Sequence, residues 1–185
     1  MIPPMDTMEI GPEHGDLTLH TGVEGRAAKA GHNLTLRMSD WSGTATFDGD
    51  EPSTLSFRTA VSSLEVVSGE GGVKALSDKD TRQIKDSALE SLSASRHPDI
   101  TFESSKVSPR SGGYDVDGEL SIAGVSQPCT LDLNVERSGG NASVEASVPV
   151  VQTTFGVKPY SAMMGGLKVK DQVEVRLSLS VPEPA

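Results

Sequence analysis

The residue types that carry most metal chemistry are few in this sequence, and their spacing does not suit it. The four histidines are His14, His20, His32 and His97. No two of them stand two apart on a strand or four apart on a helix, the spacings that let two rings share a metal ion. Asp78 and Asp80 lack the regular oxygen-ligand spacing and the terminal Glu of a calcium loop. We therefore expect no metal and no cofactor.

Nucleophilic and phosphate-binding motifs are also missing from the sequence. No Gly-x-Ser-x-Gly elbow occurs, and Cys129 is in phase with the apolar residues of an alternating run, which predicts an inert, buried thiol. The glycine runs SGEGGVKAL and AMMGGLKV lack the spacing and the Lys-Ser or Lys-Thr ending of a phosphate-binding loop. The sequence therefore contains no motif that identifies a catalytic residue.

Two segments could instead contact a ligand. His32, in the stretch AGHNL, precedes an expected strand, where its ring could bind a ligand head group or satisfy a buried backbone carbonyl. The second segment, TTFGVKPYSAMMGGL (153–167), is rich in apolar residues for a loop, and Met side chains adapt to irregular apolar ligands. It could equally pack onto its own domain. Its large apolar residues are Phe155, Tyr160, Met163, Met164 and Leu167.

Most of the chain alternates apolar and polar residues with period two, the pattern of half-buried strands. About nine such runs occur at short spacing, each bounded by Gly, Pro, Asp or Ser. The runs that are easiest to follow begin at Leu17, Leu34, Leu55, Ile100, Val116, Cys129, Val144 and Val173. The final run, 173–181, is long and apolar on one face, so leaving it as an open edge would invite aggregation. These features favour a closed antiparallel barrel.

One segment, about 77–95, has helical periodicity instead. Ile84, Ala88 and Leu92 recur every four residues. Ser77 and Asp80 form a capping-box pattern with Asp in place of Glu, and Pro98 prevents continuation of the helix. The sequence predicts one amphipathic helix inserted among the strands.

Length, composition and charge limit the number of domains and the kinds of partner that we expect. A chain of 185 residues favours one domain, and aromatic residues make up only 4%, so the core must be mostly aliphatic. The formal charge of -10 disfavours nucleic acid, anionic membrane surfaces and other polyanions as partners. We expect a disordered tail at 1–13, a barrel domain at 14–182 and a short tail at 183–185.

Three stretches together resemble the YceI-like family of bacterial lipocalin-like barrels. They are HPDITFESSKV at 97–107, YDVDGELSIAGVSQPCTLDL at 114–133 and TTFGVKPY at 153–160. Their order and spacing, with the helix before the first of them, carry the resemblance. It implies a barrel of about eight strands whose lumen binds an isoprenoid chain or a similar amphiphile. It also implies that a homodimer is possible.

We therefore expect a non-enzymatic carrier that holds an amphiphilic lipid or polyprenyl chain. The expected wall and mouth residues are Phe57, Phe102, Leu120, Phe155, Met163 and Met164, with His32 and Tyr160 as contacts for the head group. The N-terminus has neither a basic start nor a continuous apolar segment, so we expect a cytoplasmic location, or a periplasmic or secreted one if the N-terminus is truncated.

Two other classes of protein fit the same sequence. One is an enzyme with His32 as general acid or base, which needs a second polar group within hydrogen-bond reach. The other is a protein-interaction module whose core is filled with side chains. A lumen too full to admit a ligand would favour this last class.

Overall fold

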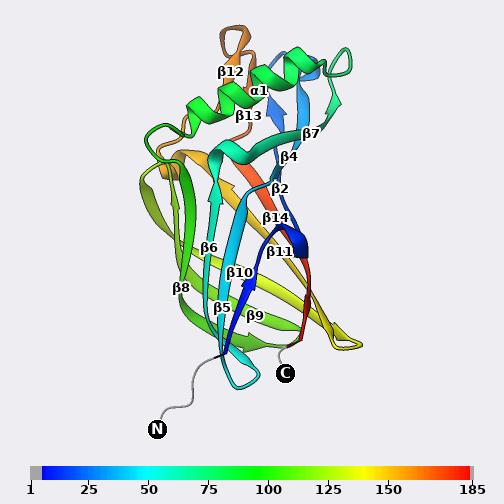
Figure 1. Cartoon of the computed structure of the whole chain (residues 1–185). Coiled ribbons are helices and arrows are strands. Elements are labelled where there is room, and N and C mark those ends of the chain that lie inside the picture. Colours follow the sequence, from blue (N-terminus) through cyan, green and yellow to red (C-terminus); the bar gives the residue numbers. More distant parts are fainter. Residues whose placement is uncertain (1–5, 184–185) are drawn as a thin grey trace.

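The computed structural model describes residues 6–183, and most of this part of the chain is antiparallel β-structure, with one α-helix (Figure 1). The strands are β1 (Asp6–Ile10), β2 (Gly15–His20), β3 (Val23–Glu24), β4 (His32–Met38), β5 (Trp41–Asp48), β6 (Glu51–Ala60), β7 (Leu64–Gly71), β8 (Asp99–Arg110), β9 (Gly113–Ile122), β10 (Val125–Ser138), β11 (Asn141–Val151), β12 (Ser161–Ala162), β13 (Leu167–Val169) and β14 (Gln172–Pro182). The helices are α1 (Asp78–Ser91) and the 3-10 turns η1 (Pro12–His14), η2 (Ala28–Ala30), η3 (Val61–Ser63), η4 (Gln152–Phe155) and η5 (Met163–Gly165).

The strands of the main sheet follow one another around a single curled wall. Their order is β1-β5-β6-β8-β9-β10-β11-β14-β2-β4-β7, and β12, β13 and β3 form a small second sheet. Three strands bend and continue into strands at the other end of this order, which closes the wall. β1 continues into β2, β4 continues into β5, and β6 continues into β7. At one of these bends the backbone N–H of Ala60 donates to the carbonyl of Asp40 at 2.9 Å.

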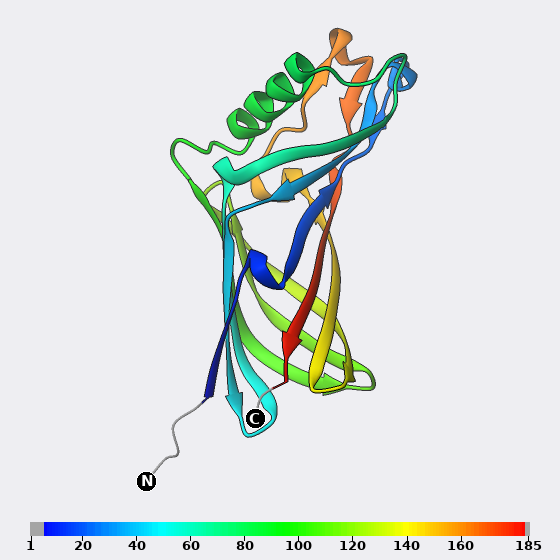
Figure 2. The ribbon, with the colours of Figure 1, turned by 45° about the vertical axis from the view of Figure 1, so that its right-hand side comes forward.

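If each bent pair is counted as one long strand, eight strands surround the interior and each pairs with the next. The predicted all-β barrel class is thereby confirmed. Figure 2 shows the sheet wrapped around a long axis, with α1 lying across one end. Gly15 permits the close approach at the bend between β1 and β2, since a β-carbon there would lie 1.9 Å from the carbonyl oxygen of Ser178.

The expected disordered tail at 1–13 is wrong over residues 6–13. Asp6–Ile10 pairs along its full length with β5, and η1 then leads into β2. Met8 and Ile10 face the interior, so burial and a strand ladder hold a segment whose sequence has no strong period. Residues 1–5 of the predicted tail, and 184–185 of the C-terminal one, lie outside the described residues.

Helix α1 confirms the predicted helix and its start. The Ser77 hydroxyl accepts a hydrogen bond from the Asp80 N–H at 3.1 Å, and the Asp80 carboxylate accepts one from the Ser77 N–H at 2.9 Å. The hydrogen bond from the Ser77 backbone N–H to the Asp80 carboxylate, followed by the interaction of that carboxylate with the Ser77 side chain, lowers the pKa of Asp80. The helix ends at Ser91, four residues earlier than predicted, and Ser93 then adopts a positive φ of 53°.

Candidate functional site

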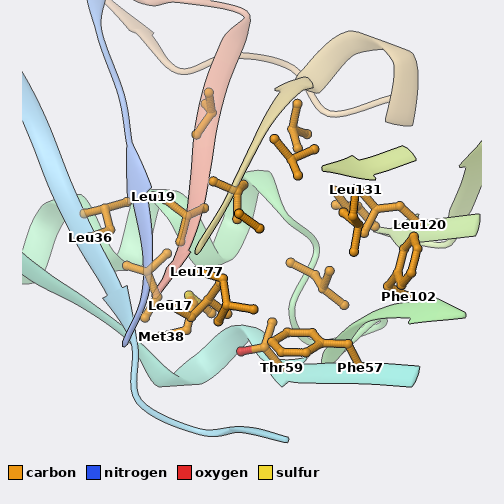
Figure 3. Close-up of a pocket in the computed structure, with 18 of the residues that line it drawn as sticks. Leu17, Leu19, Leu36, Met38, Phe57, Thr59, Phe102, Leu120, Leu131 and Leu177 are labelled. Carbon is orange, nitrogen blue, oxygen red and sulfur yellow. The ribbon is translucent and has the colours of Figure 1, made fainter. Parts of the chain in front are cut away.

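A large cavity occupies the interior of the barrel. Its volume is about 710 Å³, within the range of roughly 300–1,000 Å³ typical of sites for small molecules. The inward residues of the main-sheet strands line it, and in Figure 3 side chains such as Leu19, Phe57 and Leu131 point from different strands toward one space. The cavity persists because the inward side chains are mostly aliphatic and an eight-stranded barrel is just wide enough to hold a ligand.

The central wall contains four of the residues that sequence reasoning selected. Phe57, Phe102, Leu120 and Phe155 all line the cavity. Phe57 stands opposite Phe102 on adjacent strands, and Phe102 opposite Leu120. Their contact with a ligand stays a prediction.

Several other lining residues share the period-two pattern, but sequence reasoning did not assign them to the binding site. Figure 3 labels Leu17, Leu19, Leu36, Met38, Leu131 and Leu177 among them. Thr59 is the buried polar residue of this wall, and its hydroxyl donates to the carbonyl of Asp40 at 3.0 Å. Because that hydroxyl is satisfied, the wall presents an apolar surface here.

Helix α1 contributes a mixed face to one end of the cavity. Gln83, Ile84, Ser87, Ala88 and Ser91 line it, at the three- and four-residue spacing of one helical face. The apolar members pack toward the wall, as Ala88 does against the core. The amide and the two hydroxyls therefore add polar groups to a mostly apolar lumen.

His32 lies at this same end, at the start of β4, and lines the cavity. Its Nε2 is 2.8 Å from the backbone carbonyl oxygen of Lys74, so this nitrogen carries the proton and donates. Gly72, with a φ of +72°, leaves room for the ring, because a β-carbon there would lie 2.5 Å from it. In the described part of the chain His32 has no hydrogen bond to a carboxylate that would orient it as a base. The imidazole thus ties the start of β4 to the loop before α1.

The apolar loop 153–167 divides into two parts with different surroundings. Tyr160 lines the cavity and is 44% exposed, as expected for a residue at a mouth. Met163 and Met164 do not line it, so the prediction that they form part of the wall is wrong, and their contact with a ligand at the mouth stays a prediction. They occupy η5 at the tip between β12 and β13, where both have positive φ and both are exposed. The left-handed turn presents them to solvent.

The opposite end of the cavity has a different polar group. Arg137 lines it, donates to the hydroxyl of buried Tyr114 at 3.2 Å and forms an ion pair with Glu183 at 3.5 Å. The Tyr114 contact, first among the causes, raises the pKa of Arg137. This guanidinium therefore remains charged and paired at the end away from α1.

Residues 6–183 contain neither a metal-binding cluster nor a membrane-spanning helix. No group of three or more His, Cys, Asp and Glu side chains is arranged to hold a metal ion. No helix in the same range has the length and apolar character needed to cross a bilayer.

Comparison with known proteins agrees with this architecture. The sequence model of the YceI-like domain matches residues 9–181, which is almost the whole barrel. The chain belongs to the YceI-like family. Among curated relatives of this YceI-like chain, a UPF0312 protein of Pseudomonas aeruginosa is 27% identical over 146 residues, covering 75% of this chain and 72% of its own. One from Pectobacterium atrosepticum is 30% identical over 121 residues, covering 65% and 58%.

Solved structures share the fold of this YceI-like barrel at low sequence identity. BcnA of Burkholderia cenocepacia superimposes with a TM-score of 0.63 and 19% identity, over 89% of this chain and 96% of its own. The YCEI protein of Campylobacter jejuni gives a TM-score of 0.62 and 16% identity, over 81% and 85%. The overall fold of this chain is therefore shared with both of these proteins.

Proposed function

We propose that this YceI-like barrel binds and carries an amphiphilic lipid, with the apolar chain in the lumen, and that it is not an enzyme. The observation that carries the proposal is the cavity of about 710 Å³ inside an apolar wall. Transfer of an apolar chain into such a site releases about 0.8 kcal/mol per buried CH₂. An isoprenoid or acyl chain suits a long lumen, because both are narrow and flexible.

The polar groups at the α1 end favour placing the lipid head group there. Gln83, Ser87 and Ser91 offer an amide and hydroxyls along one helical face, and Tyr160 adds a phenol at the mouth. These are neutral donors and acceptors, which suit a polar head such as a quinone, alcohol or amide. The charged residues Lys74 and Asp80 line the cavity at the same end. The paired Arg137 marks the end that we assign to the tail.

The two rival classes receive less support. An interaction module with a filled core does not leave a cavity of about 710 Å³. An enzyme with His32 as general base needs a second polar side chain within hydrogen-bond reach, and in the described part of the chain the ring is hydrogen-bonded to the backbone carbonyl of Lys74 and to no side chain.

Native mass spectrometry of protein purified without detergent tests the proposal. We expect a discrete additional mass that organic extraction removes, and the same spectrum reports whether the protein is a monomer or a homodimer. If the protein is empty and also takes up no added polyprenyl alcohol, quinone or fatty amide, the carrier proposal is wrong.

The single cysteine provides an internal reporter of lumen occupancy. Cys129 lines the cavity, and burial raises the pKa of its thiol above the ordinary value of 9.0. Because the thiolate is the nucleophile, alkylation at pH 7 should be slower than for an exposed thiol and should keep rising with pH beyond 9. We expect bound lipid to slow it by at least about tenfold, since the lipid chain blocks access to the thiolate. Urea-unfolded protein is the control, and equal rates for loaded and extracted protein would contradict a ligand beside Cys129.

A further inference from the structure

The charges of the protein are segregated along the barrel axis. We define the mouth end as residues 22–33, 69–92 and 158–171, which carry the η2 loop, α1 and the β12–β13 hairpin. Figures 1 and 2 both place these three segments at the end opposite the start of β1 and the finish of β14. They hold 9 of the 16 Lys and Arg residues but only 7 of the 26 Asp and Glu residues. The mouth end thus has a formal charge of +2, and the rest of the chain has -12.

The basic residues at the mouth end are also unpaired. In the part of the chain that the structure describes, none of these nine forms an ion pair, whereas five of the seven basic residues elsewhere do. Lys158 and Lys168 are exposed on the segment that includes the β12–β13 hairpin. Their charge is therefore available to a partner, while most of the other basic residues are neutralised within the barrel.

Apolar side chains are exposed at the same end. Four of the five exposed large hydrophobic residues of the described chain lie there, and they are Val73, Tyr160, Met163 and Met164. Val73 is 85% exposed and Met164 is fully exposed. Met163 and Met164 have φ values of 54° and 55°, a left-handed conformation that is strained for a residue other than glycine. Backbone strain thus accompanies an apolar tip beside the cavity mouth.

We propose that the mouth end docks on an anionic lipid bilayer. Protruding apolar side chains among unpaired Lys and Arg residues match the interface of such a membrane, where apolar groups insert and basic groups meet anionic head groups. The hydrophobic residues form a tip and not a hollow, which favours a deformable lipid surface over a rigid protein. The docking surface does not require the lumen to be occupied, so it can fail or stand independently of the carrier proposal.

The net charge of -10 does not prevent this contact. Opposing charges are screened over about 8–10 Å at physiological ionic strength. A strand of 11 residues such as β11 extends roughly 35 Å, so the acidic far end lies several screening lengths from a membrane at the mouth. The hairpin from β5 to β6 carries Asp48, Asp50 and Glu51 at that far end, and the protein therefore approaches a negative surface in one orientation.

The first test removes the apolar tip. Wild type should float with phosphatidylglycerol vesicles at about 0.1 M salt and not with phosphatidylcholine vesicles. The double variant Met163→Asn/Met164→Asn should bind about tenfold more weakly or worse, because it lacks the two apolar side chains that insert into the bilayer. Asn tolerates the left-handed turn, so the melting temperature should not fall. Alkylation of Cys129 should stay unchanged, which shows an intact lumen.

The second test compares two charge reversals that change the net charge equally. Lys168→Glu, at the mouth, should weaken vesicle binding roughly tenfold. Lys106→Glu, an exposed and unpaired position on β8, should change it less than twofold. Equal effects of the two reversals, or no flotation of the wild type, would overturn the proposal. Unchanged flotation of the methionine variant together with loss of self-association in solution would instead assign the tip to a second copy of the chain.

Discussion

Replacing Ala146 with Phe is expected to abolish lipid uptake and at the same time to raise the melting temperature. Ala146 lies in the middle of β11, opposite Leu133 on one side and Leu177 on the other, and it is buried against the cavity. A phenyl ring at this position points into a lumen of about 710 Å³, where space is available. It fills part of the path of the lipid chain and adds apolar contacts to the core.

The variant should lower lipid uptake and raise the melting temperature, whereas misfolding would lower both. The two measurements therefore distinguish a blocked lumen from a misfolded protein. Filling a cavity commonly stabilises a protein by about 0.5–2 kcal/mol, or a few degrees for a chain of this size. Affinity for a long polyprenyl chain should fall at least about tenfold, because the chain must give up burial in the occupied segment. Differential scanning calorimetry and native mass spectrometry measure the two quantities.

Ser143→Phe is the matched control for this variant. Ser143 is on the same strand but is exposed on its outer face. It should leave both uptake and melting temperature nearly unchanged. Undiminished uptake by Ala146→Phe would mean that the ligand does not occupy the barrel centre.

Trp41→Ala is expected to cause a large loss of stability. Trp41 is 2% exposed, belongs to the core cluster with Met38 and Leu64, and stacks on Phe57 with ring centroids 5.4 Å apart. It stands at the bend where β4 becomes β5, so it packs the point at which the two halves of the barrel join. Truncation of a buried Trp to Ala typically costs about 3–5 kcal/mol, which corresponds to about 10 °C for a chain of this length.

Urea denaturation followed by circular dichroism measures this loss, since the variant has no remaining Trp for fluorescence. Trp41→Phe keeps an aromatic ring against Phe57 and should recover more than half of the lost free energy of unfolding. A loss below about 1 kcal/mol for Trp41→Ala would show that the bend is held by backbone hydrogen bonds such as Ala60 N–H to Asp40 and not by packing.

The sequence by itself determined the all-β class, most of the strands and the helix. Val116, Leu131, Val148 and Leu177 alternate in step with burial, because a strand places every second side chain on one face. The helix start was equally readable, since Ser77 and Asp80 bond within one turn. Each of these signals depends on residues that are close together in the chain. The family motifs then implied the barrel and its lumen.

Only the tertiary structure decided which segments meet across the barrel. β1 is a strand because it forms backbone hydrogen bonds with β5. The sequence did not predict β5, because its inward residues include Gly43 and Ala45, which give a weak apolar period. The left-handed turn at Met163 and Met164, which moves them from the lumen to an exposed tip, has no local signature in the sequence. The same is true of the charge at the mouth. A net charge sums over the whole chain, whereas a partner meets one face, and the fold alone gathers nine distant basic residues on it.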